Sequence, residues 1–100
     1  MLNRLKEYQF SALEKVFDGL PGEVYLFGSK VNLKRKGGDI DILWICPNDD
    51  LRTLQKKLEL TVKYQKMFDE RIDIQIFPSI EKMSYEEKTF YEVITKQKLF

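Results

Sequence analysis

Residues 39–46, DIDILWIC, decide the fold: two aspartates open a run of β-branched, aliphatic and aromatic residues. Such a run is typical of a buried β-strand. Because successive strand side chains point to opposite faces, Asp39 and Asp41 share one face, with Cα atoms about 6.5 Å apart. Trp44 and Cys46 lie on the other face, and we expect both in the core.

The two carboxylates at the head of this strand indicate a metal site. Like charges at this spacing repel, and aspartate is disfavoured in strands, so the pattern has a cost unless a cation lies between the side chains. The chain has no histidine, and Cys46 is its only cysteine. Oxygen ligands alone favour Mg²⁺ or Mn²⁺ over zinc. We therefore expect one of these metals at Asp39 and Asp41.

A third aspartate occupies a similar strand. Residues 71–77, RIDIQIF, alternate polar and apolar side chains, which places Asp73 on the polar face. If this strand lies beside residues 39–46, Asp73 reaches Asp39 and Asp41. Three carboxylates around two cations serve phosphoryl and nucleotidyl transfer. Each aspartate taken alone could instead pair with a lysine or cap a turn.

Helical and strand patterns fill the rest of the chain. Apolar residues recur at helical spacing over 3–18, and EVYLF at 23–27 is typical of a short strand. A second helix is expected after a cap at Asn48, Asp49 or Asp50. It carries an apolar stripe that should face the sheet, formed by Leu51, Leu54, Leu58 and Val62.

The last helix is predicted from a capping box. Ser84 followed by Glu87 precedes an apolar pattern that extends to about Lys96. The order of elements predicts an α/β (α+β) fold, with a small mixed β-sheet of three to four strands and helices packed mainly on one face.

Length and charge bound the function. We expect the one hundred residues to form a single domain, 1–100, with no room for a separate domain that binds an acceptor. The net charge of +1 argues against a partner that is a long nucleic acid. Without histidine there is no histidine-based catalytic triad, and one cysteine excludes an internal disulfide. No secretory signal or membrane-spanning run is present, so we expect a cytoplasmic protein.

Gly28 and Ser29 directly follow the strand at 23–27. Glycine lets a phosphate approach the backbone, and a serine hydroxyl can donate to that phosphate while capping a helical turn. An ordinary turn has the same two residues. Their position shortly before Asp39 is what makes them candidates for a phosphate site.

These motifs together resemble the nucleotidyltransferase superfamily of DNA polymerase beta, and most of all its minimal nucleotidyltransferases, the MNT proteins. The resemblance rests on Phe27-Gly28-Ser29, on GDIDIL at 38–43 and on Asp73 between two isoleucines. It covers almost the whole chain and implies the nucleotidyltransferase fold.

The resemblance implies a nucleotide site at the end of the first strand. Gly28 and Ser29 would contact the triphosphate of the incoming nucleotide. The family commonly has Arg-Ala-Arg-Gly after the serine, whereas the loop at 30–36 is KVNLKRK here. Lys30 would replace the first arginine as a phosphate contact. A lysine ammonium is a point charge, whereas an arginine guanidinium can bind a phosphate with two parallel hydrogen bonds.

The resemblance also implies a role for each aspartate. Asp39 and Asp41 would hold the metal ions. Asp73 would bind the second metal and help to deprotonate the attacking hydroxyl.

The implied activity is transfer of AMP from ATP to a tyrosine of a partner. Minimal members are typically antitoxins paired with a separate helical HEPN protein encoded nearby, which is the toxin. An alternative is an inactive binding module that neutralises its partner by complex formation, and a third is nucleotide transfer to a small molecule such as an aminoglycoside. A free sheet edge also makes a homo-oligomer plausible.

Overall fold

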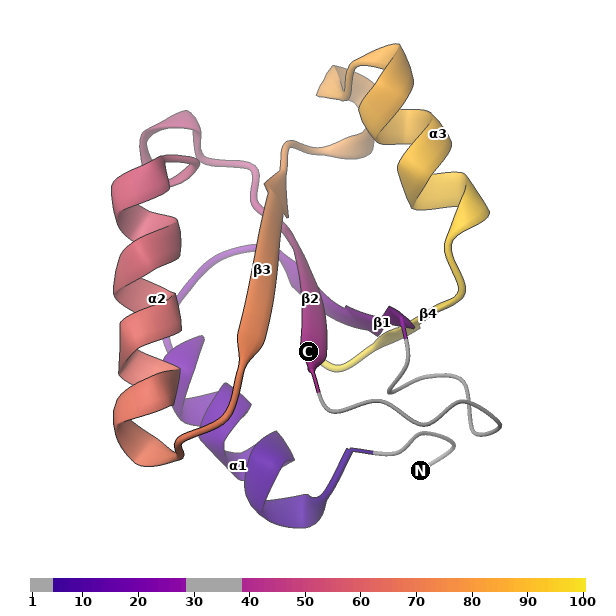
Figure 1. Cartoon of the computed structure of the whole chain (residues 1–100). Helices are drawn as coiled ribbons and strands as arrows, with labels where there is room; N and C mark the ends of the chain where they lie inside the picture. Colours follow the sequence, from indigo (N-terminus) through magenta and orange to yellow (C-terminus); the bar gives the residue numbers. More distant parts are fainter. Residues whose placement is uncertain (1–4, 29–38) are drawn as a thin grey trace.

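A four-stranded mixed sheet, in the spatial order β3-β2-β1-β4, forms the centre of the computed structural model (Figure 1). Glu23–Phe27 (β1) pairs antiparallel with Ile40–Ile45 (β2) and with Lys96–Lys98 (β4). Ile72–Phe77 (β3) runs parallel to β2. The structure describes residues 5–28 and 39–100, and all statements below concern these ranges.

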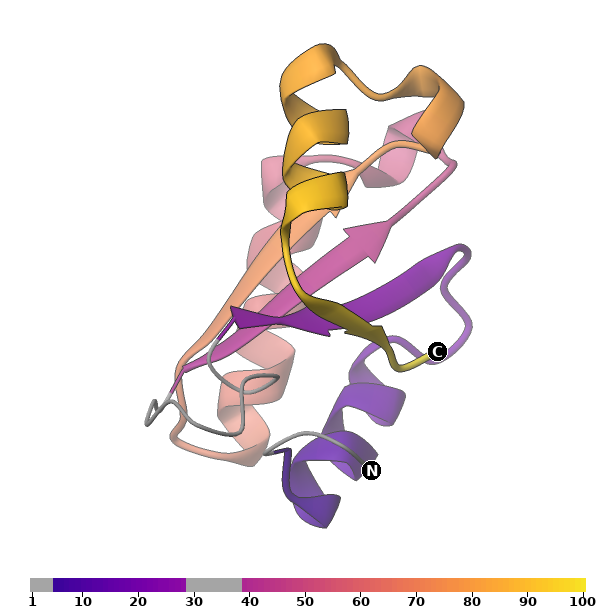
Figure 2. The same ribbon diagram turned by 90° about the vertical axis from the view of Figure 1, so that its right-hand side faces the viewer.

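Helices cover both faces of the sheet. Glu7–Val16 (α1) and Leu54–Met67 (α2) lie on one face, and Tyr85–Val93 (α3) lies on the other, as the two perpendicular views show (Figures 1 and 2). Short 3-10 turns at Asp49–Leu51 (η2) and Ile80–Lys82 (η3) follow the C-terminal ends of β2 and β3. The predicted fold class is confirmed, with two of the three helices on one face and four strands in the sheet.

The core lies between the sheet and the pair α1 and α2. Ile40, Ile42, Trp44 and Cys46 alternate along β2 and its end and are fully buried in this core. The indole Nε1 of Trp44 donates a 2.8 Å hydrogen bond to the Pro21 carbonyl, so its one polar atom is satisfied. The prediction that Trp44 and Cys46 are core residues is confirmed.

The face that α3 covers is packed by aromatic rings. The Phe90 ring lies 5.5 Å from that of Phe27 on β1 and 5.6 Å from that of Phe77 on β3, both nearly edge to face. The Tyr91 ring packs in the same way on Tyr25, at 6.0 Å. These contacts hold α3 against β1 and the end of β3.

The orientation of α2 differs from the prediction. Leu54, Leu58 and Val62 are 71%, 54% and 46% exposed, and Leu60 and Tyr64 face the sheet instead. The helix has two apolar rows, and only one can pack inward. The buried row contains the tyrosine, whose hydroxyl donates a 2.8 Å hydrogen bond to Glu70 at the far end of the helix.

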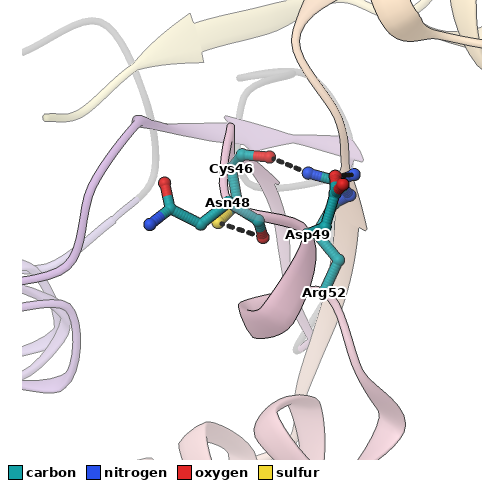
Figure 3. Close-up of polar contacts among 4 residues, drawn as sticks. All are labelled: Cys46, Asn48, Asp49 and Arg52. Atoms are coloured by element: carbon teal, nitrogen blue, oxygen red, sulfur yellow. Dashed lines mark hydrogen bonds and ion pairs between the residues drawn. The ribbon is translucent and has the colours of Figure 1, made fainter.

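The cap of α2 also differs from the prediction. Thr53 is the N-cap, and its hydroxyl accepts from the Lys56 N–H. Asp49 is unavailable as a cap because it pairs with Arg52, whose guanidinium also donates to the Cys46 carbonyl at 2.7 Å. Figure 3 shows this cluster, in which the Cys46 thiol also lies against the Asn48 carbonyl. Residues 48–51 thus form a separate 3-10 turn between β2 and α2.

The two terminal helices are shorter than predicted. The capping box of Ser84 and Glu87 is confirmed, with reciprocal bonds of 2.9 and 3.1 Å, but α3 ends at Val93 rather than near Lys96. Ile94 is extended, and the next residues form β4 against β1. The expected first helix over 3–18 is observed over Glu7–Val16, and residues 3 and 4 lie outside the described ranges.

Within the described ranges, no helix is long and apolar enough to cross a bilayer.

Two leucines of α2 provide a matched test of its orientation. Leu60 is 2% exposed, so Leu60→Ala should lower the free energy of unfolding by about 3 kcal/mol through lost burial and a cavity. Leu58→Ala should change it by less than about 0.5 kcal/mol, because the side chain is 54% exposed. Urea unfolding of both variants measures the difference. Equal losses would show that the helix packs through both rows.

Candidate active site

One row of residues crosses the whole sheet at the end of β1. Asp41 of β2 is opposite Asp73 of β3 and opposite Phe27 of β1, and Phe27 is opposite Lys96 of β4. Side chains of directly paired residues point to the same face of a sheet. The row Lys96, Phe27, Asp41, Asp73 therefore lies on one face. It is the face that α3 covers, because Phe27 packs on Phe90.

The strands therefore bring Asp41 and Asp73 together as neighbours, as the sequence predicts. Asp39 lies immediately before β2, and both Asp39 and Asp73 are exposed, while Asp41 is half-buried. Burial raises the pKa of the Asp41 carboxyl, and the negative charges of Asp73 and Asp39 raise it further. The three aspartates thus form one patch of mutual repulsion.

The donor chemistry of this patch suits a hard divalent cation. Three carboxylates offer oxygen ligands only, and a cation beside Asp41 would offset both the burial and the repulsion that raise its pKa. In residues 5–28 and 39–100, however, no group of three or more His, Cys, Asp or Glu side chains is already placed around one ion position. The acids fit a metal by charge and by register, and their roles as ligands remain predictions.

Gly28 lies in contact with the Asp41 carboxyl. Its φ of +77° is in the left-handed region that favours glycine, and a Cβ there would lie 2.3 Å from Oδ2 of Asp41. The end of β1 and the half-buried acid are therefore packed together without any side chain between them. Ser29 and Lys30, the other two predicted nucleotide contacts, lie outside the described residues, as does the rest of the loop at 30–36.

Lys96 belongs to the same row but was not among the residues that the sequence singles out. The pattern places it at the end of a helix, whereas it begins β4. KQK has no apolar alternation, so no local signal identifies this edge strand.

Comparison with known proteins identifies the family. The family model for the nucleotidyltransferase domain matches residues 9–98, and the chain belongs to this family. This confirms the resemblance seen in the sequence motifs. No curated protein matches the sequence.

Two solved structures share the fold. One chain of the toxin–antitoxin MntA-HepT has a TM-score of 0.61 and 18% identity, over 95% of this chain and 72% of that chain. A chain of a toxin–antitoxin crystallised with AMP-PNP has a TM-score of 0.63 and 19% identity, over 91% of this chain and 72% of that chain. At these identities, the likeness shows the fold.

The raised pKa of Asp41 predicts how stability depends on pH. Since the folded pKa lies above the unfolded value, ionisation of Asp41 costs stability as pH rises through this window. Asp41→Asn should therefore increase the free energy of unfolding of the metal-free protein at pH 7. The gain should shrink as pH falls through the folded pKa and should vanish only below the unfolded pKa, at about pH 3, where the carboxyl is protonated in both states. Chemical unfolding from pH 3 to pH 8 measures it.

Asp50→Asn serves as the control for this series, because Asp50 is exposed and follows the opposite end of β2. It should change stability less than Asp41→Asn at pH 7. Equal curves for the wild type and Asp41→Asn would contradict the cost that burial and repulsion place on ionised Asp41.

Gly28 and Gly19 offer a second matched pair, because both have a φ of +77°. A Cβ at Gly19 meets nothing within 4 Å, so Gly19→Ala should cost about 1 kcal/mol of backbone strain. Gly28→Ala should cost more, because the Cβ also displaces the Asp41 carboxylate. Thermal unfolding of the two variants tests this order, and equal costs would mean that Asp41 moves aside freely.

Proposed function

We propose that this chain is the antitoxin of a HEPN/MNT toxin–antitoxin pair and a metal-dependent adenylyltransferase that transfers AMP from ATP to a tyrosine hydroxyl of its partner. The observation that carries the proposal is the register of β2 and β3, which sets Asp41 beside Asp73 and next to Gly28 in a nucleotidyltransferase domain. The partner would be a helical HEPN protein encoded nearby. We place this chain in the cytoplasm, a reducing compartment in which a free, buried cysteine such as Cys46 stays reduced.

In the proposed reaction, the triphosphate binds at Gly28, Ser29 and Lys30. Mg²⁺ or Mn²⁺ held by Asp39, Asp41 and Asp73 would supply positive charge to the phosphates. Asp73 is exposed at an edge strand, where an acceptor from outside can approach it. It accepts the proton of the attacking hydroxyl, whose oxygen forms a bond to the α-phosphorus as the bond to the leaving pyrophosphate breaks.

A protein partner is supported by the outer face of α2. Leu54, Leu58 and Val62 form an exposed apolar row, and a shallow groove runs beside it. Apolar rows of this kind are typical of interfaces. The helix also carries four lysines and one glutamate, so the complementary surface would be acidic. The structural likeness to a chain of the MntA-HepT toxin–antitoxin supports a toxin as the occupant.

The same row favours a second candidate function, a binding module without catalysis. The described acids are not already gathered around one ion position, whereas the α2 row is exposed as it stands. Such a module would neutralise its partner by covering it and would need neither ATP nor metal.

Transfer of label from α-³²P-ATP tests the enzymatic proposal. With Mg²⁺ present, the HEPN-type product of a neighbouring gene should become labelled, and Asp39→Asn or Asp41→Asn should reduce labelling at least about a hundredfold, because each removes a proposed metal ligand. Mass spectrometry of the partner should locate AMP on a tyrosine. Undiminished transfer by these variants would overturn the mechanism.

The binding module makes the opposite prediction. The protein should then bind its partner with no measurable affinity for ATP at millimolar concentration, with or without Mg²⁺. Asp41→Asn would leave partner binding unchanged in both cases, so nucleotide titration is the measurement that separates them.

A further inference from the structure

The strand β4 places two lysines on the face that carries the acidic patch. Lys96 is opposite Phe27 and Lys98 is opposite Tyr25, and residues two apart on a strand share a face. The Lys98 ammonium is neutralised by Glu23, at 2.7 Å. Lys96 has no carboxylate within ion-pair distance among residues 5–28 and 39–100. Among the described residues, the charge of Lys98 is therefore neutralised by a carboxylate, whereas the charge of Lys96 is not.

Tyr91 supports the Lys96 side chain. The ammonium donates a 2.6 Å hydrogen bond to the Tyr91 carbonyl and lies 4.1 Å from the centroid of its ring. Tyr91 is in turn fixed against Tyr25, with the two hydroxyls 3.5 Å apart. An ammonium has three N–H donors, and the described residues engage one of them. The remaining donors are suited to an anion.

The register of β4 puts the backbone of Lys96 near that of Gly28. Cα atoms of opposite residues in an antiparallel pair are about 4.5 to 5.5 Å apart. Phe27 is the residue opposite Lys96, and Gly28 follows it directly. The flexible four-carbon stem of lysine allows the ammonium to turn from Tyr91 toward an anion at the end of β1.

We propose that Lys96 binds the triphosphate of the nucleotide, on the side of Gly28 opposite to the acidic patch. The inference rests on the proposed function and deepens it. The triphosphate then lies between the carboxylates of β2 and β3, which bind it through metal, and a lysine of β4, which binds it directly. In this arrangement Lys96 contacts the β- and γ-phosphates, which ATP has and AMP lacks, so it would strengthen binding of ATP over AMP.

Calorimetric titration with AMP-PNP and with AMP, in the presence of Mg²⁺, tests the assignment. Lys96→Met should weaken binding of AMP-PNP about tenfold, the loss of one charge-assisted contact, and binding of AMP less than about twofold. Lys96→Arg keeps the charge and should stay within about threefold of the wild type for both ligands. Lys98→Met is the control from the same face and should stay within about twofold.

The results separate the inference from the function on which it rests. Wild-type affinity for AMP-PNP in Lys96→Met overturns the inference alone. Equal loss of AMP-PNP and AMP overturns it as well, because a merely structural lysine would not distinguish the two ligands. If the wild type binds neither nucleotide, the proposed function and the inference both fail.

Discussion

The parallel pairing of β2 with β3 is the contact on which the rest of the site depends. Its register sets Asp41 opposite Asp73 and, on the other face of the same strands, Ile42 opposite Ile74 in the core. A slip of one residue would turn Asp73 toward the core and an isoleucine toward solvent. Burial of the isoleucines therefore fixes the position of the acids. Stability and the geometry of the site are enforced by the same alternation.

The start of β3 is held by a carboxylate that lies outside the sheet. Glu70 accepts hydrogen bonds from Tyr64 of α2, at 2.8 Å, from Gln9 of α1, at 3.2 Å, and from Tyr8. Burial raises the pKa of Tyr64, and the bond to Glu70 raises it further, so the tyrosine stays a neutral donor. Glu70 thus joins α1 and α2 two residues before β3, the strand that carries Asp73, and this limits how far that strand can shift.

The sequence predicts the fold and the acidic patch because both depend on local patterns. The alternation in residues 39–46 and 71–77 is short-range, and so is the capping box at Ser84. The sequence does not predict the orientation of α2 or the pairing of β4, because in both cases more than one arrangement fits the local pattern equally well. Nothing local decides which of two apolar rows of α2 packs inward, and nothing in KQK shows that Lys96 pairs with β1. Both outcomes come from contacts between distant segments.

The acidic patch and the α2 row are features that folding alone would not select. The burial of Asp41 and the charges around it oppose folding. The leucines and the valine of the α2 row are exposed to water, so they add no hydrophobic stabilisation to this chain. Binding explains both, since a cation relieves the first and a partner covers the second. The two lie on opposite faces of the sheet. The α2 row begins near the far half of β3, where Leu54 lines a pocket with Gln75 and Ile76, and α2 then runs back toward the start of that strand (Figure 1). A partner seated along α2 would therefore extend toward the edge strand that carries the proposed base.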